Sequence, residues 1–468
     1  MNASLFNRNV IKILVISVSI LFVVLLALAA FWTWVYPSKN FAQILGSTVV
    51  NFDALVATST PDRQKTTEER IAEAQERSSN VRGVYLAGGV AVDQGRGSTK
   101  IRDKVKELIR TTELNGVVID VKEVDGLFLG ENMKKTVKDF HDQGVWVIAR
   151  LVVFRDLGGI KAHSVSYLKL KDGTIWKDNR GGAWLDPADP RAWAYIADVA
   201  KRSIDQGFDE IQFDYIRFPS DGDLSKAAYP VYDYKTPRYV YMKKFFTYLN
   251  KELKAHKPDI IISADLFGYV ATASSDLSIG QRLADIGDSF DYISFMVYPS
   301  HYYAGFEMSA DPARALPYIK YPYKSSNIKE VVSNHPYEVV YRSLLRARDF
   351  LDGKISNGTK NLKVSQSTTT AAVSTSTNIL LTGSNVASTT PSLRISRARF
   401  RPWLQDFNLG ADTKRGIFYD AEKVRAQIKA AEDSGSSGWL LWNASNIYTE
   451  SALRKESESS ALLKAKLP

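Results

Sequence analysis

The sequence predicts a (β/α)8 TIM barrel that follows an N-terminal transmembrane helix and contains a low-complexity loop insertion. Two observations predict the barrel: short apolar runs rich in β-branched residues recur along the chain, and amphipathic segments of helical period separate them. Such alternation is typical of βα units and of a parallel sheet. The chain has 468 residues, which leaves room for termini and insertions because a barrel of this kind takes about 250 residues.

The strands are predicted from eight short runs bounded by glycine or polar residues. They are Gly83–Leu86, Val117–Val121, Val145–Val153, Glu210–Tyr215, Ile260–Ala264, Tyr292–Val297, Arg401–Leu404 and Gly438–Trp442. A count of eight favours a closed barrel over an open, doubly wound sheet.

The segments between these runs are predicted as helices because their apolar residues recur at a helical period. They are Lys100–Thr112, Glu131–Gln143, Pro190–Gln206, Arg238–His256, either Ala310–Lys320 or Tyr337–Leu351, and Ala421–Ser434. Several end at a glycine before the next strand, as at Gly116, Gly144 and Gly207. Glycine accepts the left-handed conformation that commonly follows a helix, so these positions mark the turns into the strands.

An apolar run near the N-terminus predicts a transmembrane helix over residues 13–35 and an anchor over residues 1–37. About 20 apolar residues suffice to cross a bilayer as a helix. Arg8 and Lys12 precede the run, and Trp32 lies near its far end. Basic flanks stay in the cytoplasm and aromatic rings favour the interface. We therefore expect the chain beyond the anchor to lie outside the cytoplasmic membrane.

A cleaved signal peptide is the alternative interpretation of this segment. Ala27-Leu28-Ala29 matches the small-residue pattern of a cleavage site. The apolar run continues beyond that pattern, however, whereas the core of a signal peptide usually has only about 7–15 apolar residues. Both interpretations export the rest of the chain, either held at the membrane or secreted.

The exported part divides by composition into a stalk, a barrel and a tail. These parts are residues 38–80, 81–450 and 451–468. Within the barrel, residues 357–392 are rich in Ser and Thr, and we expect a disordered loop there because such a composition buries little apolar surface. A second insertion, residues 155–187, is expected to form a hairpin around Asp172-Gly173.

Composition and charge exclude several classes of function. The net charge is +10, but the basic residues form no tract with interleaved aromatics, so we predict no nucleic-acid partner. The chain has no cysteine, which excludes disulfides and thiolate nucleophiles. Its five histidines form no HxH or HExxH pair, so we predict no metal ion and no other cofactor.

Acidic residues recur where the predicted strands end, which is where the active site of a (β/α)8 barrel lies. They are Asp120, Asp214, Asp265 and Asp406. Hydrolysis of a glycosidic bond needs two carboxyl groups, about 5–5.5 Å apart for retention or roughly 6.5–9.5 Å apart for inversion. Neighbouring strand ends supply such spacings, so Asp214 with Asp265 or Asp120 is the candidate catalytic pair.

Polar and aromatic side chains at the same end are predicted to bind the substrate. Arg150 lies in mid-strand and should point inward, because helices cover the outer face of the barrel. A nearby arginine lowers the pKa of a carboxyl group, and flat aromatic rings pack against the apolar faces of sugars. The predicted set is Arg150, Gln212, Arg217, Trp184, Tyr298, Trp403, Asp406 and Trp442.

Each of these residues also has a purely structural interpretation. An aspartate at a strand end can cap the following turn or helix. Arg150 can form a buried structural ion pair, and aromatic side chains commonly fill cores. The sequence leaves these alternatives open.

The strands also resemble the glycoside hydrolase-like domain family of bacterial cell-surface proteins, which is related to α-amylase-like barrels. The resemblance covers roughly residues 81–450 and is strongest over Phe208–Pro219. The other segments that carry it are Gly83–Leu86, Gly116–Lys122, Ile148–Phe154, Trp184–Pro187 and Arg401–Phe407.

The resemblance implies a carbohydrate substrate and makes Asp214 the leading catalytic residue. In amylase-like barrels the corresponding aspartate is the nucleophile and follows an arginine two residues earlier, whereas Gln212 stands there in this chain. The acid after the fifth strand is a glutamate in amylases and Asp265 here. The amylase mechanism therefore does not transfer residue by residue.

We predict a glycosidase that cleaves a cell-envelope or extracellular polysaccharide by carboxylate acid/base catalysis. One alternative is a non-catalytic barrel that binds a wall or surface glycan and tethers it to the membrane. Such a binder needs no carboxyl group of raised pKa beside an ionised one. A deacetylase or another metal hydrolase is the other alternative, and the sparse, scattered histidines disfavour it.

Overall fold

The computed structural model describes residues 64–159, 165–273, 275–355 and 398–456. The predicted transmembrane helix, residues 13–35, and the predicted disordered loop, residues 357–392, lie outside these ranges. Within them, no helix has both the length and the apolar character needed to cross a membrane.

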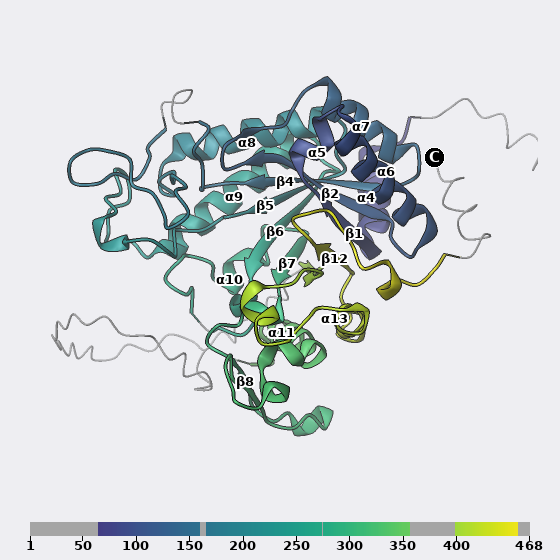
Figure 1. Ribbon diagram of the computed structural model, residues 1–468. Helices are drawn as coiled ribbons and strands as arrows, with labels where there is room; N and C mark the ends of the chain where they lie inside the picture. The colour runs from purple at the N-terminus through teal and green to yellow at the C-terminus, as the bar shows by residue number, and fades with distance from the viewer. Residues whose placement is uncertain (1–63, 160–164, 274, 356–397, 457–468) are drawn as a thin grey trace, which may run out of the picture. The chain divides into compact units, whose positions relative to one another are not determined.

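Eight parallel strands close into a barrel, as the sequence predicts (Figure 1). They are β1 (Val81–Leu86), β2 (Gly116–Glu123), β4 (Trp146–Val152), β5 (Glu210–Asp214), β6 (Ile261–Phe267), β7 (Tyr292–Met296), β11 (Trp403–Gln405) and β12 (Gly438–Trp442). Each pairs in parallel with the next, and β12 pairs with β1 to close the ring. The predicted seventh strand is shifted and split: the short β10 (Arg399–Phe400) precedes β11, and Pro402 between them has no N–H for the ladder.

Helices lie between the strands, where the apolar period predicts them. The long ones are α6 (Arg96–Thr111), α7 (Glu131–His141), α8 (Pro190–Asp205), α9 (Arg238–His256), α11 (Pro336–Leu351) and α13 (Ala421–Asp433). The short ones are α5 (Gly88–Val92), α10 (Leu283–Ile286) and α12 (Gly410–Thr413). Of the two candidate segments for the fifth predicted helix, Tyr337–Leu351 is helical.

The other candidate, Ala310–Lys320, is not a helix. Its end belongs to an antiparallel hairpin of β8 (Phe306–Met308) and β9 (Ile319–Tyr321). Pro317 lies inside the candidate segment, and proline breaks a helix because it lacks the N–H and its ring clashes with the preceding turn. The expected hairpin at Asp172-Gly173 is present, with a bridge between Lys169 and Ile175.

Alternate side chains of the strands face two different cores, as the two-residue period of a strand requires. Outward residues pack against the surrounding helices, while inward residues such as Trp146, Ile148 and Leu440 fill the barrel. At the amino-terminal end of the barrel, Arg401 and Glu210 form an ion pair at 2.8 Å, and both side chains are 0% exposed. This pair stabilises the end of the barrel opposite to the strand carboxyl ends.

The described part of the predicted stalk contacts the amino-terminal end of the barrel. It contains helix α4 (Thr67–Arg77) and a 3-10 turn, Ser78–Asn80. Arg401 Nη2 donates to the Ser78 carbonyl oxygen at 2.9 Å, and the Ser78 hydroxyl lies 3.0 Å from the Tyr292 hydroxyl. The carboxyl-terminal end therefore remains open for a site.

Candidate active site

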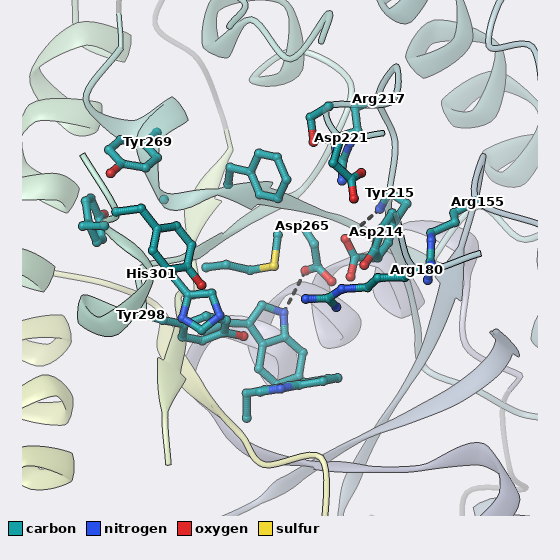
Figure 2. A pocket seen from close by; sticks show the side chains of 18 of the residues that line it. Arg155, Arg180, Asp214, Tyr215, Arg217, Asp221, Asp265, Tyr269, Tyr298 and His301 are labelled. Carbon is teal, nitrogen blue, oxygen red and sulfur yellow. Dashed lines mark hydrogen bonds between the residues drawn. The ribbon is translucent and has the colours of Figure 1, made fainter. Parts of the chain in front are cut away.

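A cavity of about 520 Å³ opens at the carboxyl end of the barrel strands (Figure 2). Its wall combines acidic, basic and aromatic side chains from strand ends and the loops that follow them. It is lined by Arg150, Arg155, Asp178, Arg180, Asp214, Tyr215, Arg217, Ser220, Asp221, Asp265, Phe267, Gly268, Tyr269, Met296, Tyr298, His301, Tyr302, Tyr303, Trp403 and Trp442. Seven of the eleven predicted site residues are among them.

Arg150 is the central cation of the site. It projects inward from β4, and the strand register places it opposite Asp120 of β2 and Gln212 of β5. Its guanidinium donates to Asp120 at 2.5 Å, to Glu123 at 2.9 Å and to Asp214 at 2.6 Å. Arg150 Nε also lies 3.7 Å from Asp265 Oδ2. One buried cation thus organises four carboxyl groups, and it also lines the cavity.

Asp214 ends β5 and points into the cavity (Figure 2). Arg150 Nη2 donates to its Oδ2, and the Tyr215 backbone N–H donates to its Oδ1 at 2.6 Å. Tyr215 has φ of +53°, a left-handed conformation that is uncommon outside glycine. The backbone is therefore strained at the residue that directly follows Asp214. Strain of this kind clusters at functional sites, where the surrounding structure holds it in place.

Asp265 lies beside Asp214 in the same wall (Figure 2). Trp403 Nε1 donates to its Oδ1 at 2.9 Å, while its Oδ2 has no hydrogen-bond partner among the described residues. Burial raises the pKa of Asp265 well above its ordinary value, and the negative charge of Asp214 raises it further. Asp265 is therefore the carboxyl group of this pair that favours the protonated form.

Asp120, the third predicted catalytic residue, lies behind Arg150 and does not line the cavity. Its side chain is 0% exposed, and it also accepts a hydrogen bond from the Tyr85 hydroxyl. Burial raises the pKa of Asp120 to about 8. The geometry suits Asp120 to holding Arg150 in place rather than to contacting a substrate.

Three predicted substrate-binding residues also lie away from the cavity wall. Gln212 faces inward one layer below Asp214, where its Nε2 donates to Ser294 at 3.1 Å. Trp184 is fully buried, with its Nε1 donating to Asp178. Asp406 accepts hydrogen bonds from the backbone and hydroxyl of Thr449, so it holds the loop after β12. Arg150, Arg217, Tyr298, Trp403 and Trp442 do line the cavity.

Several wall residues were not predicted because they lie on irregular loops with no strand-end pattern. Arg155, Asp178 and Arg180 belong to the insertion after β4, and His301 follows β7. Burial and the positive charge of Arg180 lower the pKa of His301 to about 4. The insertion after β4 was visible in the sequence as a break in the βα rhythm, but nothing in its residues showed which of them face the barrel.

Metal ligation is not supported within the part of the chain that the structure describes. No group of three or more His, Asp or Glu side chains there is arranged to hold a metal ion. The clustered carboxyl groups at the centre of the site surround Arg150 instead.

Replacing Trp403 by phenylalanine is expected to move the alkaline limb of any activity to higher pH by about one unit. The Trp403 hydrogen bond lowers the pKa of Asp265, so its loss raises that pKa and keeps Asp265 protonated at higher pH. A hydrogen bond to a charged group is worth about 1.5–3 kcal/mol, and one pH unit corresponds to about 1.4 kcal/mol. The pH profile of kcat/KM checks this, and a limb that stays or moves down contradicts Asp265 as the acid.

Comparison with known proteins places the chain in a family. No curated protein matches it. Solved structures that it resembles include a hypothetical protein from Ruminiclostridium thermocellum, 30% identical, covering 39% of this chain and 96% of that one, with a TM-score of 0.33. The glycoside hydrolase domain of PgaB (BpsB) from Bordetella bronchiseptica is 14% identical, covering 79% and 95%, with a TM-score of 0.46. The C-terminal domain of a putative chitinase from Desulfitobacterium hafniense is 10% identical, covering 82% and 98%, with a TM-score of 0.43.

A family model also matches more than half of the chain. It spans residues 127–361 and 363–448, which contain six of the eight barrel strands and both Asp214 and Asp265. The chain therefore belongs to the family described as "Putative glycosyl hydrolase domain".

Proposed function

We propose that this protein is a glycosidase that cleaves a cell-envelope or extracellular polysaccharide, with Asp265 as general acid and Asp214 as nucleophile or base. The observation that carries the proposal is the pair itself. Asp214 and Asp265 lie together in one cavity wall and contact one guanidinium, yet their surroundings differ. Carboxyl groups with different environments are how glycosidases obtain an acid and an ionised partner at the same pH.

The contacts of each carboxyl group support this division of roles. Asp214 accepts two short hydrogen bonds from N–H donors, one of them charged, and an ionised carboxylate is acceptor-only. Asp265 has a raised pKa and an Oδ2 with no described hydrogen-bond partner. Because Asp265 lines the cavity, a proton held by this carboxyl group would lie beside a bound sugar.

Aromatic side chains supply the surfaces that a sugar ring needs. Tyr298, Trp403 and Trp442 line the cavity close to the acidic pair, and Tyr269 and Tyr303 lie in its wall as well. We also propose that residues 13–35 hold the protein in the cytoplasmic membrane with the barrel outside, where wall and surface polysaccharides are found.

The test is an assay of the full chain, purified in a mild detergent because residues 13–35 are apolar. Bacterial wall and exopolysaccharide glycans are offered as a panel, and released fragments are identified by mass spectrometry. Asp198→Asn, an exposed residue of α8 that does not line the cavity, serves as the matched control. We expect fragments from at least one glycan, equally from the wild type and the control.

The alternative is a glycan-binding barrel without catalysis. It is favoured if a glycan binds saturably, no fragments appear over long incubation, and replacement of Asp214 or Asp265 leaves binding unchanged. A carboxyl pair with divided roles has no purpose in such a binder.

A further inference from the structure

Arg217 is a buried cation in the cavity wall, and one edge of its guanidinium makes no hydrogen bond with a described residue. The residue is 5% exposed and lines the cavity (Figure 2). Its guanidinium lies 4.5 Å from the ring centre of Phe267, 5.0 Å from that of Trp184 and 5.1 Å from that of Tyr215. Such contacts hold the planar group in one orientation.

Within the described part of the chain, one nitrogen of this guanidinium donates hydrogen bonds. Nη1 donates to the Phe218 carbonyl oxygen at 3.1 Å and to the Ser220 hydroxyl at 3.1 Å. Among the described residues, Nε and Nη2 donate to no acceptor, and no carboxylate lies within ion-pair distance of the group. Nε and Nη2 form the side edge of the guanidinium, whose parallel N–H groups match the two oxygens of a carboxylate.

Other arginines of this chain show what that edge binds. Arg155 donates from Nε and Nη2 to Asp178 at 2.6 and 3.2 Å. Arg191 uses the same two nitrogens for Asp189 at 3.0 and 2.9 Å. The edge that binds a carboxylate in both cases is open in Arg217 and is reached from the cavity.

The surroundings of Arg217 leave its charge incompletely compensated. Burial removes Arg217 from water and lowers its pKa. Asp214 attracts it but is hydrogen-bonded to Arg150, and Asp221 attracts it from the same wall without touching it. A buried cation of this kind gains from an anionic ligand that fills its free edge.

A second cation of the wall is also without a partner. The Arg180 side chain makes no hydrogen bond or ion pair with a described residue, and it points into the cavity (Figure 2). Arg155, in contrast, is neutralised by Asp178. Among the described residues, Arg180 and Arg217 are therefore two guanidinium groups of the cavity wall that form no ion pair.

We propose that the substrate is an acidic polysaccharide, in which a sugar bound in this cavity carries a carboxylate that Arg217 binds through Nε and Nη2 while Arg180 attracts it. This inference rests on the proposed function, because it names the class of glycan that the acidic pair would cleave. A neutral glycan would leave the Arg217 edge without an anion.

The test compares matched ligands that differ only in the carboxylate. Oligosaccharides of polygalacturonate, alginate and hyaluronan are used as prepared and after reduction of the carboxyl group to a hydroxymethyl group. Binding to the full chain in detergent is measured by titration calorimetry. We expect at least one acidic oligosaccharide to bind roughly 10- to 100-fold more tightly than its reduced form, the range for charge-assisted hydrogen bonds.

Variants assign the effect to Arg217. Arg217→Gln is expected to weaken binding of the acidic form by roughly 10- to 100-fold and to weaken binding of the reduced form much less, because a neutral hydroxymethyl group makes no charge-assisted hydrogen bond. Arg217→Lys keeps the charge but loses the paired N–H groups, so it should recover only part of the loss. Arg202→Gln, an exposed arginine on α8, is the control and should bind like the wild type.

Asp221→Asn provides a second measurement that does not depend on the Arg217 variants folding. Removing the nearby negative charge should tighten binding of the acidic form and leave the reduced form unchanged. If acidic and reduced forms bind equally, or neither binds, the inference is overturned, while cleavage of a neutral glycan would still support the glycosidase. Selective acidic binding without any cleavage would overturn the proposed function and keep the inferred ligand class.

Discussion

Replacement of Asp214 by asparagine is expected to lower kcat by about 10⁴-fold, the upper end of what a single proton-transfer group contributes. Asparagine has the size of aspartate and its Oδ1 still accepts from the Tyr215 backbone N–H, so the fold should survive. What is lost is the charged oxygen beside Asp265. Fragment release at saturating substrate and circular dichroism measure the two effects, and a loss of less than tenfold would contradict the assignment.

Asp214→Asn is also expected to shift the pH dependence of the remaining activity. The charge of Asp214 raises the pKa of Asp265, so its removal lowers that pKa and moves the alkaline limb of residual activity to lower pH. Asp198→Asn should leave the limb in place. The anomeric configuration of the product that the wild type releases separates the two chemical roles, because retention identifies a nucleophile and inversion identifies a base.

Replacement of Arg150 by methionine is expected to cost about 3–5 kcal/mol of unfolding free energy at pH 8, the penalty for removing one partner of a buried ion pair. Arg150 contacts four carboxyl groups, Asp120, Glu123, Asp214 and Asp265. Without it these groups repel one another in a buried site. The loss should appear in urea unfolding followed by tryptophan fluorescence, with the exposed Arg202→Met as control.

The cost of removing Arg150 should shrink toward pH 5. The pKa of Asp120 is already raised to about 8, and loss of a neighbouring cation raises it further. A carboxyl group whose pKa is higher in the folded state binds protons that the unfolded chain does not, so its stabilisation is present at low pH and lost as pH rises through the folded pKa. A loss that is equal at pH 5 and pH 8 would show that packing, and not charge, dominates.

The sequence alone determined the architecture of the barrel. The two-residue period of the strands and the helical period between them follow from local residue choice. All eight strands overlap the predicted runs, although the seventh is shifted and split. Asp120 and Asp265 lie within β2 and β6, and not at the predicted strand ends, because both strands extend further than their apolar runs. The position of Asp214 at the end of β5 and the inward direction of Arg150 follow from the same alternation. These features could be predicted because each depends on neighbours within a few residues along the chain.

The composition of the wall was decided only by the tertiary structure. Asp406 accepts two hydrogen bonds from Thr449, which lies in the loop after β12. Trp184 belongs to the insertion after β4 and packs against the Arg217 guanidinium. Arg180 reaches the cavity from that same insertion. These contacts join residues that lie far apart in the sequence, in loops that have no regular hydrophobic period. No local sequence pattern therefore predicts them.

For Arg150, the sequence predicted the direction of the side chain but not its role. Its strand position indicated that it points inward, but its sequence neighbours could not show whether it served structure or substrate. Closure of the barrel brings β2, β5 and β6 around β4, and their carboxyl groups meet at its guanidinium. The pairing of charges across strands depends on which strands become neighbours, and only the closed sheet decides that.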